Sequence, residues 1–597
     1  MSADRPAAGA APADGAVRAR VAARATTVAA TIVPGPPSPL GYRTLARAAG
    51  EPLAARTDLG GAAPSGPFRS LLVFVHLSDL HVTDPQSPAR AEFLDRHGDP
   101  DSPLAAALGR IGTYRAQEML TYQVVEAMVR AVRELDGGPL TGAPPAFAVS
   151  TGDATDNSQA NELEAYVALL DGGSEVVPDS GDSRRYEGVG AEEPYDPRYW
   201  HPDGTPPGAD DDVPRRRHGL PVVHGLLDAC RAPFVATGLG LDWYAVFGNH
   251  DAMLGGTLPV TPALAARAVG GDKPVGLDEG VDVLGLLADN ETRPSTEEWG
   301  VATGPTRPVT PDARRRPVPV GEWIAAHLPG HGYDEVAAAA ERAHYAFDAG
   351  SIRCVVLDTV NRAGGWQGSL TAEQLAWLEA ELAAGHSRHL DALGDEVATE
   401  APDRLFVLFS HHSLETLVND HSPDGALRHL ADDVRALLAR FPNVVAWFNG
   451  HTHVHSVTPL PAGGGGLWQV TTASHVDWPQ QSRVVELALD ETSGDLVVGT
   501  AVFDHAGALD PRAGELRDPV TLAGWSRELA ANAWQGRVPA GGTDGGAAPG
   551  REPRWAAEPV GRGAAADRNV VLVVPAPFPL GDTVTAGAIS ARDAAQS

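Results

Sequence analysis

The segment VFVHLSDLHVTDP places a carboxylate and an imidazole two positions apart, at Asp79 and His81. Residues i and i+2 of an extended chain project to the same side, so the two side chains can converge on one point. Carboxylate oxygen and imidazole nitrogen are both metal ligands, which makes a cation the expected occupant of that point. Two ligands do not complete a site, so further donors must come from elsewhere in the chain.

Four more apolar runs of the sequence end in side chains that can bind metals. FAVSTGDATDN ends with Asp153, WYAVFGNHD with Asn249, His250 and Asp251, LFVLFSHHS with His411 and His412, and VVAWFNGHTH with His451 and His453. In a layered α/β fold the carboxyl ends of strands line one crevice, so these side chains are expected to meet there. Glycines beside them, at positions 152, 248 and 450, allow tight turns and close backbone approach.

The donors outnumber what one tetrahedral ion can bind. Two carboxylates, one amide and four imidazoles, counting one of the adjacent pair His411 and His412, suit two neighbouring ions that share a carboxylate. The nitrogen and oxygen set is compatible with two divalent or trivalent transition-metal ions, among them Mn, Fe, Zn, Co and Ni. Such a pair can activate a water as hydroxide and hold two oxygens of a phosphoester. The sequence therefore predicts metal-dependent hydrolysis of a phosphoester.

Strand and helix patterns alternate through most of the chain. Helical periodicity marks residues 114–135, and residues 371–382 carry a capping box from Thr371 to Gln374 before an apolar face. Runs rich in apolar and β-branched residues predict strands at 71–78, 146–150, 243–247, 344–348, 352–357, 405–410, 444–448, 467–473, 482–489 and 496–503. This alternation predicts an α/β layered architecture.

The motifs D-x-H, G-D, G-N-H-D, H and G-H-x-H, in this order and each after an apolar run, resemble those of the calcineurin-like metallophosphoesterase superfamily. The resemblance covers about residues 70–505. The sequence is also similar to a bacterial subgroup of this superfamily whose members have long inserts. It implies a four-layer αββα sandwich of two mixed sheets flanked by helices. Asp156 stands where purple acid phosphatases have a tyrosine, which argues against a ferric tyrosinate site. G-D-x-T-D instead resembles the cyclic-nucleotide and glycerophosphodiester phosphodiesterase branch.

The resemblance also implies a role for each donor. One metal would be held by Asp79, His81, Asp153 and His453, and the other by Asp153, Asn249, His411 and His451, so that Asp153 bridges the two. His250 would act beside the substrate, stabilising charge or protonating the leaving oxygen, and Asp251 would orient it. His411 is chosen over His412 because the family places the ligand first in H-[H/Y/S]-P, although Ser413 replaces the proline here.

Charge and composition limit the classes of partner. The net charge of −31 opposes a broad nucleic-acid footprint, so no nucleic-acid partner is expected. The longest apolar stretches have strand length, so membrane insertion is not expected either. The two cysteines, Cys230 and Cys354, are far apart in apolar surroundings and predict buried fillers. A soluble protein with a small phosphoester substrate is the resulting prediction.

Gly, Pro and Asp-rich segments predict the domain organisation. We expect a disordered tail over 1–40, a metallophosphoesterase domain over 41–510 with inserts at about 85–112, 171–218 and 255–320, and a partly linker-like extension over 511–597. The composition of the inserts is compatible with disorder or with a functional cover, and we expect a cap over the ligand-bearing edge. Residues 569–575 predict an edge strand. The N-terminus has no recognisable signal and no paired arginines, so a cytoplasmic location is expected; export stays open if the chain starts elsewhere.

Two alternatives compete with a hydrolase. One is a catalytically silent metal-binding protein that uses its inserts for recognition, and the presence of all seven ligand types plus His250 argues against it. The other is a nuclease, which would need a basic groove that the acidic sequence does not show. His475 and Asp477 follow the last ligand-bearing run, where either a position at the pocket rim or a turn-stabilising role is compatible with the sequence.

Overall fold

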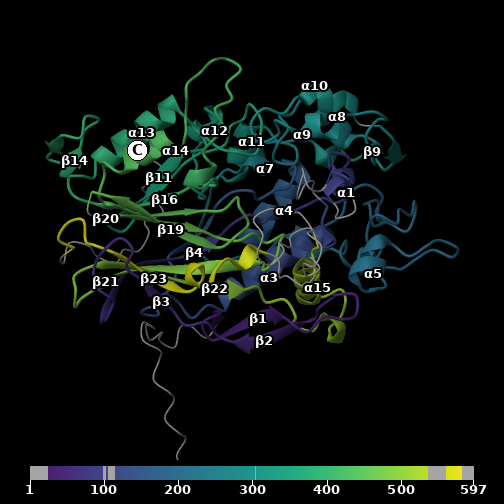
Figure 1. Ribbon diagram of the computed structural model, residues 1–597, viewed down its shortest axis with the longest axis horizontal. Coiled ribbons are helices and arrows are strands. Elements are labelled where there is room, and N and C mark those ends of the chain that lie inside the picture. Colours follow the sequence, from purple (N-terminus) through teal and green to yellow (C-terminus); the bar gives the residue numbers. More distant parts are fainter. Residues whose placement is uncertain are drawn as a thin grey trace, which may run out of the picture.

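The ten runs predicted as strands all form strands. They are β4 (Phe68–Leu77), β5 (Phe147–Ser150), β8 (Trp243–Ala245), β11 (Tyr345–Ala349), β12 (Ile352–Val356), β16 (Leu405–Phe409), β18 (Val444–Asn449), β20 (Gly465–Thr471), β21 (Gln481–Asp490) and β22 (Leu496–Asp504). The structure is a computed structural model that describes residues 25–98, 102–104, 114–302, 304–463, 465–534 and 560–580 (Figure 1).

One large sheet has seven strands in the order β3-β23-β22-β21-β4-β5-β8. Strands β4, β5 and β8 are parallel neighbours, whereas β21 runs antiparallel to β4. β23 (Val570–Val574) lies in the stretch predicted as an edge strand, but it pairs with β22 on one side and with β3 (Ala54–Arg56) on the other. The C-terminal extension therefore supplies an inner strand of this sheet.

The second large sheet has six strands in the order β11-β12-β16-β18-β20-β19. Its four central strands are parallel, and β11 and β19 (Ser456–Ala462) run antiparallel at the two edges. Both large sheets are therefore mixed, as the resemblance implies.

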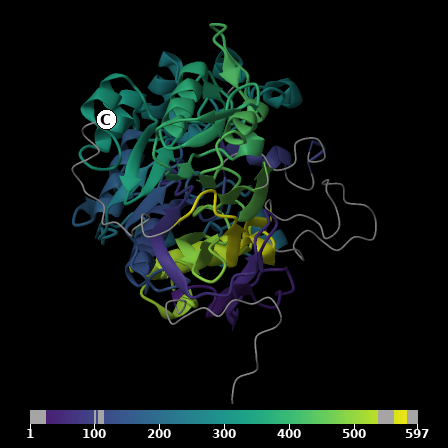
Figure 2. The same ribbon diagram turned by 90° about the vertical axis from the view of Figure 1, so that its left-hand side faces the viewer.

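The two sheets pack face to face. The ring of Phe74 on β4 lies 5.5 Å from the ring of Phe409 on β16 and 5.0 Å from that of Phe448 on β18, edge to face in both cases. Helices α13 (Ala372–Ala383) and α14 (Ala431–Leu438) share a core with the six-stranded sheet, and α3 (Thr121–Arg133) lies beyond the seven-stranded sheet next to α15 (Pro519–Ala531) (Figures 1 and 2). Ligand-bearing strands of both sheets are thus held in fixed relation.

Local sequence explains where these helices begin and which face they bury. The Thr371 hydroxyl accepts a hydrogen bond from the Gln374 backbone N–H at 3.2 Å, which caps α13 as predicted. Leu378 and Leu382 on that helix are fully buried. In α3, the predicted stripe is buried at Val125, Met128, Val129 and Val132.

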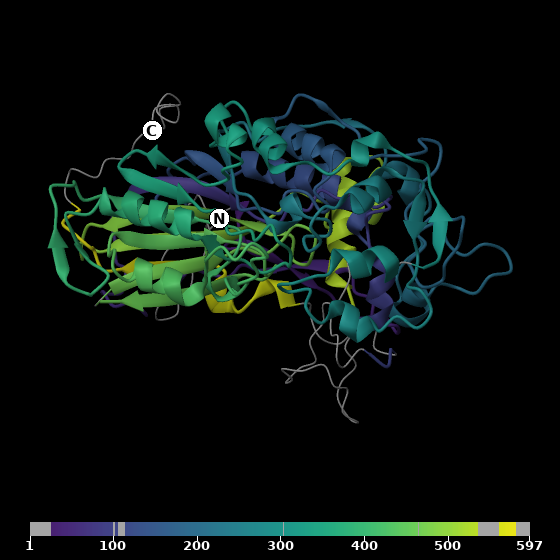
Figure 3. The same ribbon diagram turned by 90° about the horizontal axis from the view of Figure 1, so that it is seen from above.

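The predicted inserts are folded where they are described. Residues 255–320 contain α8 (Pro262–Val269), β9 (Asp272–Pro274), α9 (Val283–Leu287), α10 (Thr296–Ala302) and β10 (Thr306–Pro308). This insert shares an apolar cluster with the segment that follows β4, through Phe93, Leu94, Leu286 and Trp299. The insert over 171–218 instead shares an apolar cluster with α15, through Tyr199, Trp200 and Trp525. Both segments lie in the right-hand half of the molecule in Figure 3.

The remaining elements are short. They are β1 (Ala30–Pro34), β2 (Leu45–Ala49), α1 (Asp95–Gly98), α4 (Ala160–Asp171), β6 (Glu175–Val176), α5 (Val213–His218), α6 (Leu226–Ala229), β7 (Phe234–Val235), α7 (Asn249–Ala252), α11 (Val320–Ala326), α12 (Glu335–Ala339), β13 (Leu370–Thr371), β14 (Arg388–Leu390), β15 (Glu396–Ala398) and β17 (Arg428–His429). None of the helices in these described ranges combines the length and the hydropathy needed to cross a bilayer.

The prediction of a disordered tail over residues 1–40 is wrong for residues 25–40. β1 pairs with β2 in an antiparallel ladder, and the Thr27 backbone N–H donates to the Val502 carbonyl on β22 at 2.9 Å. Backbone hydrogen bonds to the main sheet thus order part of an Ala-rich segment whose composition suggested a tail. Residues 1–24, and most of the linker-like stretch over 536–568, lie outside the described residues.

Candidate metal centre

The predicted ligands follow the carboxyl ends of five parallel strands. Asp79 and His81 come after β4, Asp153 after β5, Asn249 after β8, His411 after β16, and His451 and His453 after β18. Three groups of three donor atoms, each group within 4.8 Å, contain six of these residues: Asp79, His81 and His453; Asp79, Asp153 and His411; and His411, His412 and His451. The two sheets therefore bring segments from across the whole chain to one small volume.

The Asp153 carboxylate lies at the middle of this volume. Its Oδ2 atom is 3.7 Å from His81 Nε2 and 3.2 Å from His411 Nε2. His453 Nε2 is 3.2 Å from His81 Nε2 and 3.4 Å from an oxygen of Asp79. A carboxylate between two sets of imidazoles is placed where a ligand shared by two cations would be needed.

Three of the imidazoles have their Nδ1 atoms fixed by other groups. His81 Nδ1 lies 3.0 Å from Asp156 Oδ1, His411 Nδ1 2.8 Å from the Thr151 carbonyl, and His453 Nδ1 2.7 Å from Asp477 Oδ2. An Nδ1–H that donates to an oxygen fixes the tautomer and leaves the Nε2 lone pair for a metal. All three Nε2 atoms face the central carboxylates, which is the arrangement of a metal-binding set.

The side-chain oxygen of Asn249 is a further possible metal ligand, and no group in the described structure is bonded to it. Its amide nitrogen donates to the Gly256 carbonyl at 2.9 Å, whereas its Oδ1 atom is buried and has no hydrogen-bond partner in the described structure. A buried acceptor without a partner is costly and is found where a ligand completes the site. The donor set and this oxygen together fit two transition-metal ions.

The backbone around these donors is strained. Asp79, His81, Asp153, His451 and His453 all have positive φ angles, between 44° and 68°. Such conformations cost free energy in residues other than glycine and cluster at functional sites. At Gly450, an added Cβ would lie 2.1 Å from Asp79 Oδ2, so only glycine permits this approach.

Burial and mutual charge shift the pKa values of the centre in opposite directions. Burial alone would lower the pKa of His411, but the carboxylates of Asp153 and Asp79 raise it to about 9. Burial favours the neutral form of Asp153, yet His411, His250 and His81 hold its pKa well below the usual value. Burial together with the neighbouring imidazoles of His412 and His411 lowers the pKa of His451. The metal-free centre therefore carries ionised carboxylates and a protonated His411 at neutral pH.

Metal binding is expected to release protons. His411 is protonated below pH 9 in the metal-free protein and must be neutral to bind a cation, so metal affinity should rise as pH increases towards 9. Titration calorimetry with Mn²⁺ at pH 7 in buffers of different ionisation enthalpy should show release of at least about one proton per chain. Binding that is independent of buffer and pH would contradict this arrangement.

Comparison with known proteins adds little to this geometry. No family model matches the sequence, and no curated protein matches it. Similar solved structures include a dimetal phosphatase from Danio rerio (14% identity, 73% of this chain and 100% of that chain, TM-score 0.29) and the sulfate thiohydrolase SoxB from Termus thermophilus (12%, 78% and 61%, 0.25). A putative 5'-nucleotidase from Staphylococcus aureus gives 12%, 76% and 58%, with a TM-score of 0.26. These TM-scores are too low to establish a shared fold or activity.

His250 lies at the edge of the centre. Its backbone N–H donates to Asp153 Oδ1 at 2.8 Å, and its Nδ1 lies 2.7 Å from the Asp156 carbonyl. The side chain keeps 18% of its surface exposed, in contrast to the fully buried His411. The ring is therefore anchored at Nδ1 while the residue stays accessible from outside.

The predicted role of Asp251 in orienting His250 is corrected. Both of its carboxylate oxygens are occupied: one accepts from the Gly248 backbone N–H at 3.0 Å, and the other accepts from the backbone N–H of Thr155 at 3.0 Å and from its hydroxyl at 3.1 Å. Asp251 thus ties the turn after β8 to the turn after β5, and a backbone carbonyl holds the His250 ring instead. Sequence spacing alone could not distinguish these partners.

Two further histidines have structural roles. His412 Nε2 donates to the Trp366 carbonyl at 2.9 Å, and its Nδ1 lies 2.8 Å from the Thr359 hydroxyl, so both nitrogens are used and His411 is the available ligand of the pair. His475 lies 2.8 Å from the Ser78 carbonyl through Nδ1 and 2.9 Å from the Ser482 hydroxyl through Nε2. His475 therefore supports the turn that carries Asp79.

Asp156 and Asp477 are the functional residues for which sequence analysis found no specific role. Each holds the Nδ1 atom of one imidazole, His81 for Asp156 and His453 for Asp477. Each carboxylate is itself held by a guanidinium, Arg90 for Asp156 and Arg115 for Asp477. The only sequence signals were the place of Asp156 in the G-D-x-T-D motif and the place of Asp477 after the last ligand-bearing run.

The substitution Asp477→Asn is expected to weaken binding of one metal by about 10- to 100-fold, because His453 loses the partner that fixes its tautomer and orientation. Equilibrium dialysis with Mn²⁺ measures the effect. Arg115→Met is the matched control, since it removes the other partner of Asp477 and leaves the Asp477–His453 pair in place. Equal loss of affinity in both variants would contradict the role given to Asp477.

Proposed function

We propose that this protein is a dinuclear metal-dependent phosphoesterase that hydrolyses a small phosphodiester or phosphomonoester. The observation that carries the proposal is the orientation of three Nε2 atoms towards Asp79 and Asp153, together with the unpartnered Oδ1 of Asn249. Asp79, His81, Asp153 and His453 would hold one ion, and Asp153, Asn249, His411 and His451 the other. When bound, the ion pair would supply Lewis acidity towards the phosphoryl oxygens and a water of lowered pKa.

The residues around the centre would orient the ester and move protons. Because the Nδ1 atom of His250 donates to a carbonyl, the proton that this residue exchanges with substrate must be carried at Nε2. In its protonated form that nitrogen would stabilise negative charge on the phosphoryl group or pass a proton to the leaving oxygen. The hydrogen bond from the His250 backbone N–H to Asp153 Oδ1 holds His250 next to the carboxylate that would be shared by the two ions.

The proposal also covers the arrangement of layers in the fold and the branch of the superfamily that the sequence resembles most. A four-layer αββα sandwich is supported by the contact of Phe74 with Phe409 and Phe448 across the sheets, and by α13 and α14 on one outer side and α3 on the other. The G-D-x-T-D motif at Asp153 favours the cyclic-nucleotide and glycerophosphodiester branch of the calcineurin-like superfamily, within a subgroup that has long inserts. The net charge of −31 disfavours a nuclease.

Hydrolysis by the metal-loaded protein tests the proposal against a silent metal-binding protein. Purified protein loaded with Mn²⁺ is assayed on bis(p-nitrophenyl) phosphate, p-nitrophenyl phosphate, cyclic nucleotides and glycerophosphodiesters, with metal content measured on the same sample. Turnover of at least one ester that chelation abolishes and Mn²⁺ restores is the expected result. Two bound metals without turnover of any ester would favour the silent binding protein.

A further inference from the structure

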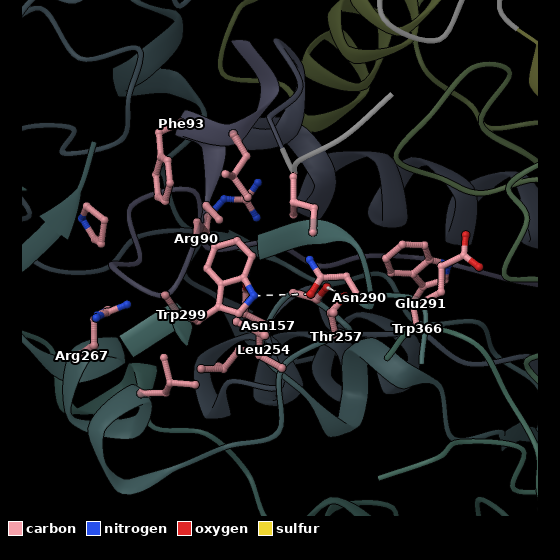
Figure 4. Close-up of a pocket in the computed structure, with 18 of the residues that line it drawn as sticks. Arg90, Phe93, Asn157, Leu254, Thr257, Arg267, Asn290, Glu291, Trp299 and Trp366 are labelled. Carbon is pink, nitrogen blue, oxygen red and sulfur yellow. Dashed lines mark hydrogen bonds between the residues drawn. The ribbon is translucent and has the colours of Figure 1, made fainter. Parts of the chain in front are cut away.

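A cavity of about 800 Å³ adjoins the metal centre (Figure 4). His451, Thr452 and His453 line it, together with residues 88–94, residues 254–299 in and next to the folded insert, and Arg115, Asn157 and Trp366. The inserts predicted at 85–112 and 255–320 therefore border the ligand-bearing edge, whereas the insert over 171–218 does not line this cavity. A cavity of this size is typical of sites that enclose a whole small molecule, far larger than a phosphate group.

Aromatic and aliphatic side chains make up slightly more than half of the lining of the cavity, and polar side chains make up the rest. Phe93 and Trp299 are almost fully buried, at 2% and 5% exposure, and Leu254 and Leu258 add aliphatic surface. The Trp299 indole N–H donates to Asn290 Oδ1 at 3.4 Å, which fixes the ring within the cavity wall (Figure 4). Trp366 adds a third aromatic side chain and is half-buried. Because Phe93 and Trp299 are almost fully buried, they back the wall, and the half-buried Trp366, Leu258 and Leu287 supply apolar surface that a ligand can contact.

The arginines closest to the centre are already neutralised by carboxylates. Arg90 donates to Glu92 at 3.2 Å and to Glu118 at 2.8 Å, and it also bonds to Asp156. Arg115 donates to both oxygens of Asp477, at 2.8 and 3.1 Å. Both guanidiniums are bound to the carboxylates that hold His81 and His453. They are therefore poorly suited to bind a second phosphate. The cavity thus favours an uncharged group beyond the one phosphate at the centre.

We propose that this cavity binds the bulky, uncharged apolar ester group of the substrate, with aromatic rings the favoured form. The inference rests on the proposed function, in which the phosphate lies at the metal centre beside His451 and His453. It goes beyond that function because it infers the class of substrate from the cavity walls that the inserts form. Esters with a small alcohol, and esters with a second phosphate, would leave these apolar walls in contact with water.

Binding of simple phosphate monoesters tests the proposal without requiring turnover. Calorimetry on the metal-loaded protein compares methyl phosphate, octyl phosphate and 1-naphthyl phosphate, with turnover products measured separately. The parent protein is expected to bind 1-naphthyl phosphate at least about 10-fold more tightly than methyl phosphate, because the ring buries apolar surface. Octyl phosphate shows whether an alkyl chain binds as well as an aromatic ring. Tight binding of either octyl or 1-naphthyl phosphate supports an apolar site.

Two tryptophan variants locate the effect. Trp299→Ala and Trp366→Ala are each expected to reduce the preference for 1-naphthyl over methyl phosphate by about 5-fold or more. Trp366 is half-buried and only its backbone carbonyl holds His412, so its variant keeps the test valid if Trp299→Ala does not fold. Trp377→Ala is the matched control, because that half-buried ring lies on α13 and does not line the cavity.

The outcomes separate this proposal from the proposed function. Equal binding of methyl, octyl and 1-naphthyl phosphate by the parent, or an apolar preference that neither Trp299→Ala nor Trp366→Ala reduces, would overturn the cavity proposal even if small esters are hydrolysed. An apolar preference that both variants lose, in a protein that hydrolyses no ester, would uphold the cavity as a binding site and refute the hydrolase.

Discussion

Asp153→Asn is expected to lower kcat/KM on any phosphoester substrate by about 1,000-fold or more, because the proposed centre loses the charge that both cations share. The amide is nearly isosteric with the carboxylate, so packing around β5 should change little. The lost charge affects ligands of both proposed ions, since Asp153 Oδ2 lies 3.7 Å from His81 Nε2 and 3.2 Å from His411 Nε2. Steady-state kinetics with saturating Mn²⁺ measures the effect.

The control for this variant is Asp395→Asn, which removes an exposed carboxylate from the turn between β14 and β15, outside the ligand-bearing turns. Its activity should match that of the parent. Circular dichroism and thermal melting should show that both variants fold. Activity that survives Asp153→Asn within about 3-fold would rule out a shared carboxylate at this position.

The second large effect is expected from His250→Ala, which should reduce kcat by about 100- to 1,000-fold on esters with poor leaving groups. The metal content should not change, because the Asp153 contact of residue 250 is made by its backbone N–H at 2.8 Å. Only the imidazole and its proton are lost. His224→Gln is the matched control, because that side chain is 80% exposed.

The dependence on leaving group gives this prediction a specific signature. An alkoxide needs a proton as it departs, whereas p-nitrophenolate does not. The loss caused by His250→Ala should therefore be much larger for an alkyl ester than for a p-nitrophenyl ester. An equal loss on both esters would assign His250 to charge stabilisation, and no loss on either would remove it from the reaction.

The strands and the convergence of the donors could be predicted from the sequence because both depend on local patterns. Continuous apolar runs such as residues 405–410 are typical of strands covered on both faces, and the structure buries every residue of β16. Donors placed directly after such runs must lie at one edge of parallel strands. This rule predicts that Asp79, Asp153 and His411 lie together, although they are 74 to 332 positions apart in the chain.

Partners that are set by tertiary contacts could not be predicted in this way. Asp477 reaches His453 and Asp156 reaches His81 because turns from different strands meet, and no spacing in the sequence encodes that approach. Asp251 stands next to His250 in sequence but faces Thr155 and Gly248 instead. Neighbouring positions in a tight turn point in different directions, which is why adjacency predicted the wrong partner.

The inserts show the same limit. Their Gly, Pro and Asp content alone does not distinguish disorder from the expected cap, since such segments lack the periodicity of regular elements. In the structure, Lys273 of the insert is fully buried and donates to Glu92 at 2.9 Å and to the Ser87 carbonyl at 2.7 Å. A buried ion pair between distant segments holds the insert to the segment after β4, and it has no signature in the local sequence.

The number of metal ions bound per chain tests the proposed centre most directly. Plasma mass spectrometry is applied to protein saturated with Mn²⁺ and freed of excess metal, alongside the Asp153→Asn variant. The convergence of Asp79, Asp153, Asn249 and the four histidines predicts about two ions per chain in the parent and a lower number in the variant. A parent protein that retains no Mn²⁺, Zn²⁺ or Fe under these conditions, or a variant that retains as much as the parent, would contradict a dinuclear centre at these residues.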